Sequence, residues 1–288
     1  MSLEPNSQNR AARTSELLEV GGISVGGIET SIDIPSLKLC FDLGRVPDVA
    51  VTRGLVLFTH AHMDHMGGIA WHTATRALRG MAAPTYVIPR ESQAGLEALF
   101  SAWRSLDRSR MPHELVALSP GEEHRISPGL VARAFHSPHT APCQGYALIF
   151  ERKRLREEFR GLSEHTVREL SVERRVEVTQ VVRSVELAFT GDTRPEILEK
   201  EELLRSARVL VIECTFLDER VSAREAHQKG HVHLDHLIER AHLLTNERIV
   251  LTHFSARYTS AEIVRLLDQR LPAELRSRVV PLLGGRPR

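Results

Sequence analysis

One run of residues, His60-Ala-His-Met-Asp-His65, constrains this chain more than any other feature. It follows directly on the apolar residues 55–58, which have the composition of a buried strand, and Gly67-Gly68 just after it lets the chain turn sharply. Two histidines at positions i and i+2 of an extended segment point to the same side and can bind one metal ion. The aspartate and histidine that follow can bind a second ion once the chain has turned. The run therefore predicts a metal site at the end of a buried strand.

Further ligand-type residues stand after other apolar runs. Asp192, in Thr190-Gly-Asp-Thr193, follows residues 187–189, and a carboxylate at such a tight turn could bridge two ions. His253 follows residues 249–251, and His136 and His139, in His-Ser-Pro-His, are two candidates for one remaining position. Each of these residues alone is more often a turn aspartate or a core histidine. Together they could complete two metal spheres with open positions for water and substrate.

The predicted metals define the chemistry. Imidazole and carboxylate suit Zn²⁺ first, with Mn²⁺ and Fe²⁺ as alternatives, so we expect two Zn²⁺ ions as cofactors. Two ions can lower the pKa of a shared water and neutralise the charge that builds on a transferring phosphoryl or acyl oxygen. Asp64 would orient that water and accept its proton, and His231 would protonate the leaving oxygen, with Glu213 orienting His231. These roles predict a metal-dependent hydrolase.

Several other polar and aromatic residues lack support from a motif. Asp42, after an apolar run, is expected to be a turn residue, and Trp71 and Trp103 are expected in the core rather than as platforms for base stacking. The histidines outside the motifs are expected on the surface or in the core: His72, His113, His124, His165, His227, His236 and His242.

The hydrophobic pattern favours a mixed α/β (α+β) fold. Short apolar runs typical of buried strands occur at 37–41, 55–58, 86–88, 130–132, 146–150, 187–189, 209–212 and 249–251. Helical spacing occurs at 67–79, 91–105, 195–205, 234–245 and 260–270. Strands and helices mixed without strict alternation indicate central sheets with helices outside. We expect a flexible polar tail over residues 1–16 and a single domain over 17–288.

A charged insertion at about 151–186 interrupts this pattern. Its basic residues, among them Arg152, Lys153, Arg154 and Arg156, alternate with glutamates, so its net charge is close to neutral. One interpretation is a solvated helical excursion stabilised by i,i+4 ion pairs. The other is an RNA-facing arm, because opposite charges can still segregate onto two faces.

Composition and cysteine content bear on the possible partners and on the cellular compartment. A net charge of +1 does not by itself indicate a nucleic-acid binder. The three cysteines are far apart and form no CxxC pair, which favours a reducing compartment. We see neither a secretory signal nor a membrane-spanning stretch. The expected location is therefore cytoplasmic, without contact to a membrane.

The motifs together resemble those of a known family. The resemblance covers roughly residues 20–285 and is to short forms of ribonuclease Z (tRNase Z), in the metallo-β-lactamase fold superfamily. Thr252-His-Phe-Ser-Ala-Arg-Tyr258 is the most discriminating motif, because most superfamily members have only the histidine there. The other matching segments are His60–His65, Gln144-Gly-Tyr146, Phe189-Thr-Gly-Asp-Thr193, Glu213-Cys-Thr-Phe216 and Gly230-His231.

The resemblance implies an αββα sandwich, with two mixed β-sheets flanked by helices in four layers. It implies a first metal bound by His60, His62 and His139, a second bound by Asp64, His65 and His253, and Asp192 bridging them. It also implies that Glu213 and His231 serve the leaving group. The expected activity is that of a zinc-dependent phosphodiesterase, an endoribonuclease that processes tRNA 3′ ends. The expected partners are a tRNA precursor or another RNA, and a second copy in a homodimer.

Some family features are missing, and two alternatives stay open. The N-terminal Pro-x-Lys-x-Arg-Asn loop and the Gly/Pro-rich arm are absent, while His-Glu-Ala-Thr is replaced by Ile212-Glu-Cys-Thr and Gly-His-Ser by Gly230-His-Val. One alternative is a small-molecule metallo-hydrolase acting on a thioester, lactone, lactam or cyclic phosphodiester. The other is a non-catalytic RNA-binding relative, against which the full ligand set argues.

Overall fold

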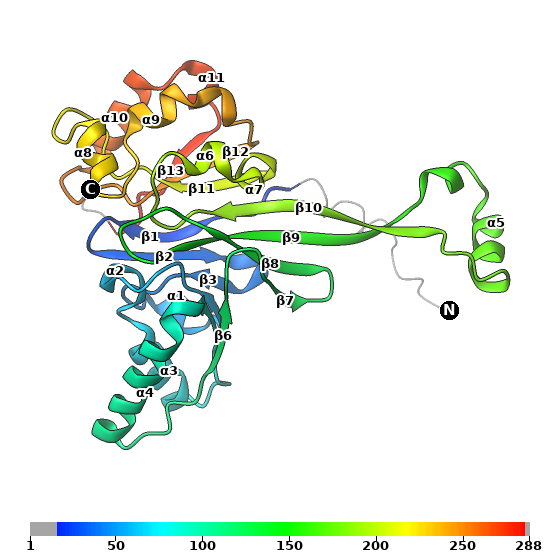
Figure 1. Cartoon of the computed structure of the whole chain (residues 1–288), viewed down its shortest axis with the longest axis horizontal. Helices are drawn as coiled ribbons and strands as arrows, with labels where there is room; N and C mark the ends of the chain where they lie inside the picture. The colour runs from blue at the N-terminus through cyan, green and yellow to red at the C-terminus, as the bar shows by residue number, and fades with distance from the viewer. Residues whose placement is uncertain (1–15, 286–288) are drawn as a thin grey trace, which may run out of the picture.

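Two β-sheets lie face to face in the computed structural model, which describes residues 16–285, so the tail predicted over 1–16 lies almost wholly outside the described residues (Figure 1). The first sheet runs β1 (Gly21–Val25), β2 (Glu29–Ile34), β3 (Leu39–Phe41), β4 (Leu55–Leu57), β5 (Thr85–Pro89) and β6 (Glu114–Leu118). The second runs β13 (Val279–Pro281), β12 (Arg248–Thr252), β11 (Val209–Glu213), β10 (Thr179–Phe189), β9 (Gln144–Leu155), β8 (Leu130–His136) and β7 (Glu123–Ser127).

Helices cover the outer face of each sheet (Figure 1). Outside the first sheet lie α1 (Asp48–Val51), α2 (Met63–Met66), α3 (Ile69–Leu78) and α4 (Gln93–Asp107). Outside the second lie α6 (Ile197–Lys200), α7 (Glu202–Ser206), α8 (Ala223–Gln228), α9 (Leu234–Glu239), α10 (Ser260–Arg270) and α11 (Ala273–Arg276). Both sheets contain parallel and antiparallel pairs, so the predicted four-layer αββα sandwich of mixed sheets is confirmed.

Alternate residues of one strand supply different layers of the core. In β11, Val211 packs between the two sheets, whereas Leu210 and Ile212 pack against the outer helices. In β4, Leu57 faces the other sheet and Val56 faces the helices. Strands buried on both faces are apolar at every position, which is why the sequence shows them as short continuous runs.

The expected elements can be compared with those observed. A helix lies within each of the five predicted ranges, but the one expected over 195–205 is divided into α6 and α7 at Glu201, and the one expected over 234–245 ends at Glu239 and is followed by a 3-10 turn. All eight predicted strands are present as well. The pattern missed β1, β2, β7 and β13, because their sequences are short, polar or rich in glycine, and it also missed the apolar β6.

The parallel strands place the functional loops at one end of the sandwich. β3 to β6 are parallel neighbours in the first sheet, and β10 to β13 in the second. The carboxyl ends of parallel strands meet at one edge of a sheet. The residues that follow β4, β10, β11 and β12 therefore converge.

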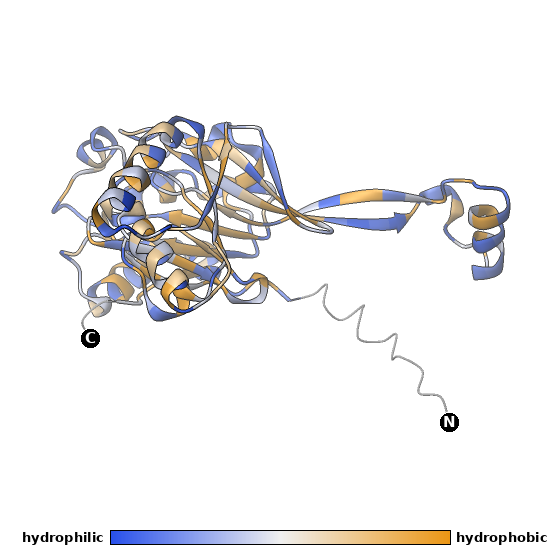
Figure 2. Cartoon of the chain, turned by 90° about the horizontal axis from the view of Figure 1, so that it is seen from below, coloured by the Kyte–Doolittle hydropathy of each residue, from blue (hydrophilic) through white to orange (hydrophobic). Residues whose placement is uncertain are grey.

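The charged insertion is an arm. β9 and β10 pair over their whole length, from Phe189–Tyr146 in the body to Thr179–Leu155 beyond it, and the tip carries α5 (Glu164–Arg168) (Figures 1 and 2). The interpretation as a helical excursion is therefore wrong for the stem of the arm, which is extended. Hydrophilic residues interrupt the apolar ones along the stem (Figure 2). Within residues 16–285, no helix combines the length and the apolarity that crossing a membrane requires.

Candidate metal centre

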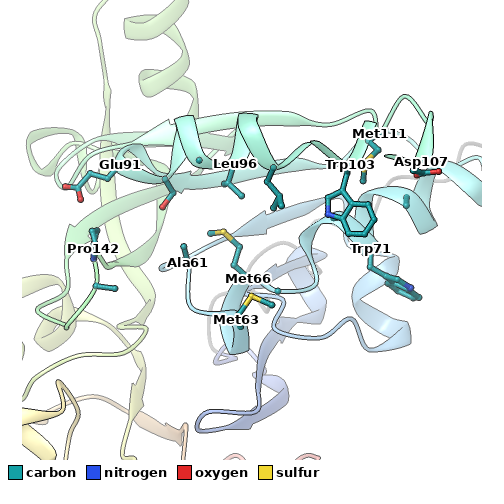
Figure 3. Close-up of a pocket in the computed structure, with 17 residues that line it drawn as sticks. Ala61, Met63, Met66, Trp71, Glu91, Leu96, Trp103, Asp107, Met111 and Pro142 are labelled. Carbon is teal, nitrogen blue, oxygen red and sulfur yellow. The ribbon is translucent and has the colours of Figure 1, made fainter. Parts of the chain in front are cut away.

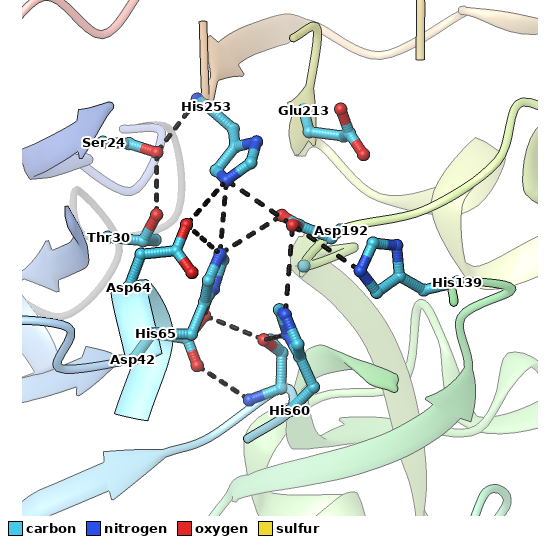
Figure 4. A network of polar contacts seen from close by, with 12 residues as sticks. Ser24, Thr30, Asp42, His60, Asp64, His65, His139, Asp192, Glu213 and His253 are labelled. Atoms are coloured by element: carbon cyan, nitrogen blue, oxygen red, sulfur yellow. Dashed lines mark hydrogen bonds and ion pairs between the residues drawn. The ribbon is translucent and has the colours of Figure 1, made fainter. Parts of the chain in front are cut away.

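Loops after the strands bring histidines and aspartates into one cluster (Figure 4). A first group whose ligand atoms lie within 4.8 Å of one another comprises His60, His62, His139 and Asp192. A second group of the same compactness comprises Asp64, His65 and His253, and a third comprises Asp192, His231 and His253. The cluster fits a metal site. His139 belongs to it and His136 does not, so the structure separates the two candidates that the sequence left open for one position.

Asp192 lies at the centre of the cluster, as its place after β10 led us to expect. Its carboxylate oxygens are 3.3 Å from His65 Nε2, 3.5 Å from His253 Nε2 and 3.9 Å from His60 Nε2. Burial alone would raise the pKa of Asp192, but the surrounding imidazoles, His253 first, hold it well below its usual value. The central carboxylate is therefore ionised and faces ligands of both groups.

Protein groups at Nδ1 aim four of the imidazoles at the cluster through Nε2. His65 Nδ1 is 2.8 Å from Asp42 Oδ2, and His139 Nδ1 is 2.9 Å from the carbonyl oxygen of Gly230. Threonine hydroxyls lie 3.0 Å from His60 Nδ1 and 2.9 Å from His253 Nδ1. A partner at one ring nitrogen fixes the tautomer and leaves the other nitrogen for a metal.

His60 gives the clearest test of whether the cluster fits a metal ion. Its Nε2 is buried and has no hydrogen-bond partner among the described residues. Burial, and then the neighbouring His65, hold the pKa of His60 well below its usual value, so the ring is neutral and Nε2 offers a lone pair. A buried acceptor without a partner is costly unless a ligand occupies it. The donor set therefore fits a bound metal ion.

Asp42 contacts the cluster from behind, although the sequence did not single it out. It lies at a turn, as expected, with φ of 56°, but it is fully buried. Its carboxylate accepts hydrogen bonds from the backbone N–H and the hydroxyl of Thr59 and from His65. The only sequence feature that could have indicated this contact is the position of Asp42 after an apolar run. An aspartate at such a position is more often a simple turn residue.

Glu213 and His231 form a pair beside the cluster. Glu213 is buried at the end of β11, and its Oε1 accepts a hydrogen bond of 2.9 Å from His231 Nδ1. Burial opposes the charge on His231, but Glu213 outweighs it and raises the pKa of His231 to about 9. The imidazole is therefore held protonated at neutral pH, which suits a proton donor.

The turn between β1 and β2 forms a wall of the second group. The backbone N–H of Gly27 donates to Asp64 Oδ2 at 2.9 Å, and the Ser24 hydroxyl accepts from the N–H of His253 at 2.9 Å. A Cβ on Gly26 would lie 2.8 Å from the carbonyl oxygen of His253. The sequence showed only a glycine-rich stretch here, so this role was missed.

The Phe-Ser-Ala-Arg-Tyr motif after His253 is structural. Phe254 and Tyr258 are buried. The Tyr258 hydroxyl accepts from the N–H of Leu217 and donates to Asp218, and the Arg220 guanidinium lies 4.3 Å from the ring centre. These contacts support the loop that follows β11.

Some residues considered in the sequence lie away from the cluster. Arg152, Lys153 and Arg154 are on the arm, and Arg156 pairs with Glu177 at its tip. Several of the other histidines have structural contacts, as expected: His72 bonds to Tyr86, His113 stacks on Phe100, and His236 completes the cap of α9.

An apolar groove of about 820 Å³ begins beside the cluster and runs between α3 and α4 (Figure 3). Ala61 and Met63, from the motif itself, line one end, and Trp71 and Trp103 line the other. The two tryptophans are 52% and 44% exposed, so the prediction that they belong to the core is wrong. Helical spacing alone cannot distinguish a face that packs on the sheet from one that lines a groove.

Comparisons with known proteins agree with this geometry. Residues 44–254 match the family model described as Beta-lactamase superfamily domain. The chain is 39% identical to tRNase Z TRZ1 of Arabidopsis thaliana, over 96% of this chain and 99% of that protein. It is 35% identical to the chloroplastic tRNase Z TRZ2 of the same plant, over 96% of this chain and 78% of that protein.

Solved structures share the fold. The short form of human tRNase Z superposes with a TM-score of 0.58 at 17% identity, over 83% of this chain and 93% of that one. The metallo-β-lactamase fold protein YhfI of Bacillus subtilis superposes with a TM-score of 0.58 at 12% identity, over 91% of this chain and 94% of that one. Identity along nearly the whole length of the plant protein, with the cluster in place, shows that this chain belongs to the tRNase Z family of the β-lactamase superfamily.

Proposed function

We propose that the protein is a zinc-dependent endoribonuclease that cleaves tRNA precursors at their 3′ end. The observation that carries the proposal is the histidine–aspartate cluster with the Glu213–His231 pair beside it. Relatives named tRNase Z that align along the whole chain support RNA as the substrate. They do not favour the small-molecule hydrolase considered from the sequence.

The compact groups support the assignment of ligands. We assign His60, His62 and His139 to a first zinc ion, Asp64, His65 and His253 to a second, and Asp192 as the bridge between them. Imidazole and carboxylate donors favour Zn²⁺, with Mn²⁺ and Fe²⁺ as alternatives. When bound, such ions lower the pKa of water and neutralise charge on phosphoryl oxygens.

The chain's own residues perform the proton transfers. Hydrogen bonding and neighbouring imidazoles outweigh burial and hold the pKa of Asp64 below its usual value, so this carboxylate is ionised and orients the attacking water. His231 is protonated and donates its proton to the leaving oxygen. Glu213 holds His231 through Nδ1, which leaves Nε2 for that donation.

The arm supports a role in gripping RNA. We propose that Arg152, Lys153, Arg154 and Arg156 contact the RNA backbone. Residues directly opposite each other in an antiparallel pair share a face. Arg152 and Arg154 face Val182 and Gln180, so their side of the stem carries no acidic residue at these positions. These two arginines are the principal contacts.

The groove between α3 and α4 supports a homodimer. Its lining includes Met63, which is 77% exposed, and both tryptophans, and exposed apolar surface of this kind marks association sites. We propose that a second copy covers it. Residues 17–288 would then act as a single hydrolase domain in each copy.

Three free, buried cysteines support a reducing compartment, and we propose the cytoplasm.

Cleavage of a tRNA precursor by the purified full chain tests the function. We expect trimming that depends on added Zn²⁺ and stops with a chelator, and metal analysis should find two ions per chain. A metal-loaded protein that leaves tRNA precursors intact while hydrolysing thioesters or lactones would overturn the substrate. A folded protein that takes up no metal would overturn the enzyme itself.

A further inference from the structure

Two threonines occupy equivalent positions on opposite sides of the cluster. The Thr59 hydroxyl lies 2.8 Å from the Asp42 carboxylate and 3.0 Å from His60 Nδ1. The Thr215 hydroxyl contacts the Glu213 carboxylate and lies 2.9 Å from His253 Nδ1. Both threonines are buried. Each therefore links a carboxylate to a histidine of the cluster.

The donors around Glu213 fix the direction of the hydrogen bonds at Thr215. An ionised carboxylate can only accept, and Glu213 receives the backbone N–H of Thr193 and Val232, His231 Nδ1–H and the Thr215 hydroxyl. Because the Thr215 proton points at Glu213, only a lone pair remains for His253. His253 must then carry a proton on Nδ1, and its Nε2, which lies 3.5 Å from Asp64 and 3.3 Å from His65 Nε2, faces the cluster.

The same reasoning applies to Thr59, but its carboxylate partner, Asp42, holds a different kind of histidine. Its hydroxyl donates to Asp42 and accepts from His60 Nδ1–H. The second histidine on Asp42 is His65, which belongs to the cluster. The second histidine on Glu213 is His231, which we assign to the leaving group. Of the two threonines, Thr215 is thus the one whose carboxylate partner also holds the proton donor.

We propose that Thr215 is a positioning residue with two tasks, aligning His253 for the second metal and fixing the Glu213 carboxylate that holds His231. Its role toward the second metal stands on geometry alone, whereas its role toward the leaving group rests on the proposed function. Thr59 performs only the metal task, for the first group. The two threonines therefore form a matched pair for experiment.

Metal titration of the full chain tests the first task. Thr215→Val keeps the shape of the side chain and removes the hydroxyl, and it should weaken one of two Zn²⁺ sites by about 10–100-fold, the usual effect of losing a partner behind a ligand. Thr215→Ser should restore the site. Adding Thr215→Val to His253→Ala, which removes the ligand that Thr215 contacts, should weaken that site no further. Thr73→Val, which removes a buried hydroxyl far from the cluster, should bind both ions as the wild type does.

Substrates with different leaving groups test the second task, at saturating Zn²⁺. Bis(p-nitrophenyl) phosphate releases a weakly basic phenolate that needs no proton, whereas RNA releases an alkoxide that does. Thr215→Val should lower kcat on RNA more than it lowers kcat on the aryl ester. Thr59→Val, which has no link to Glu213, should change kcat on both substrates in the same proportion, and Thr73→Val should match the wild type on both.

The results separate this proposal from the proposed function. Wild-type metal affinity at both sites in Thr215→Val would overturn the metal task, and equal kcat losses on the aryl ester and on RNA would overturn the leaving-group task. Neither the metal titration nor the aryl ester needs a tRNA precursor. Failure of the wild type to cleave tRNA precursors would overturn the proposed substrate and leave the metal task standing.

Discussion

Individual hydrogen bonds at Nδ1 convert a group of histidines into a set of metal-facing atoms. Asp42 does this for His65, and the Gly230 carbonyl does it for His139. Four imidazoles in one small volume would repel one another if they were all protonated. The neutral His60 and the ionised Asp192 show how the cluster avoids this. Replacing individual residues of the cluster should therefore have different effects on metal binding and on catalysis.

Asp192 is expected to be indispensable. Asp192→Asn removes the charge that faces both groups, so the metal content should fall and RNA cleavage should be lost by about 100-fold or more, as for other groups that act on the transition state. Metal analysis and single-turnover kinetics measure these effects. The control is Asp268→Asn, on the exposed face of α10, which should behave as the wild type. Retention of both metals in Asp192→Asn would rule out the bridging role.

His231 predicts a pH dependence. A proton donor with a raised pKa is charged at neutral pH and loses its proton as the pH rises through that pKa. The pKa of about 9 is an upper bound for the active enzyme, because bound cations oppose the positive charge. The kcat on RNA should therefore fall on the alkaline side, at or below about pH 9.

The variant His231→Gln tests the origin of that fall. It should lower kcat by about 10²–10⁴-fold and remove the alkaline decrease. Rates measured from pH 6 to 10 on RNA and on bis(p-nitrophenyl) phosphate provide the comparison. An alkaline fall that persists unchanged in His231→Gln would show that another group donates the proton.

At the scale of elements, the β1–β2 turn and the arm matter most. No sequence motif indicated a role for the turn. Nevertheless it hydrogen-bonds to Asp64 and holds the backbone of His253, whose φ is 59°. The arm extends two strands of the second sheet beyond the body (Figure 1). One element shapes the site and the other lies far from it.

Gly26→Ala should loosen the second metal group. The new Cβ would meet the His253 carbonyl at 2.8 Å and its ring at 3.3 Å, so the turn must move away from His253. We expect weaker binding of one Zn²⁺ ion and a modest loss of thermal stability, measured by titration and by calorimetry. Gly21→Ala, in the same hairpin, meets no atom within 4 Å and is the matched control. Equal behaviour of the two variants would contradict this view of the turn.

The two faces of the arm predict different effects on RNA binding. Arg154→Gln removes a charge from the face without acidic neighbours, so affinity for a tRNA precursor should fall and the slope of log K against log salt should decrease by about 1. Lys153→Gln should have a smaller effect, because Glu151 and Arg183 form an ion pair on its face. Fluorescence anisotropy at several salt concentrations measures both. Equal effects, or none, would argue against a basic face that grips RNA.

At the scale of the whole molecule, the groove between α3 and α4 leaves large apolar side chains exposed (Figure 3). If a second copy covers them, Trp103→Glu should convert a dimer to a monomer, because a charge would be buried in the interface. Sedimentation velocity measures this, and Leu162→Glu, at the arm, is a control of similar exposure to solvent. A wild-type monomer at micromolar concentration would contradict the homodimer.

The sequence by itself pointed to histidines and aspartates that cluster and to the class of fold, because both are written in local patterns. His60 to His65 lie within one loop, and strands buried on both faces must be apolar throughout. Asp192 and His253 could be proposed because each follows such a run. The residues alone left His136 and His139 open, and the resemblance chose His139, which does join the cluster. The tertiary structure alone decided what no local pattern encodes: that Asp42, Thr59 and Thr215 contact its imidazoles. A turn aspartate and a strand-end threonine have many uses, and only their contacts with residues distant in the chain show which use applies here.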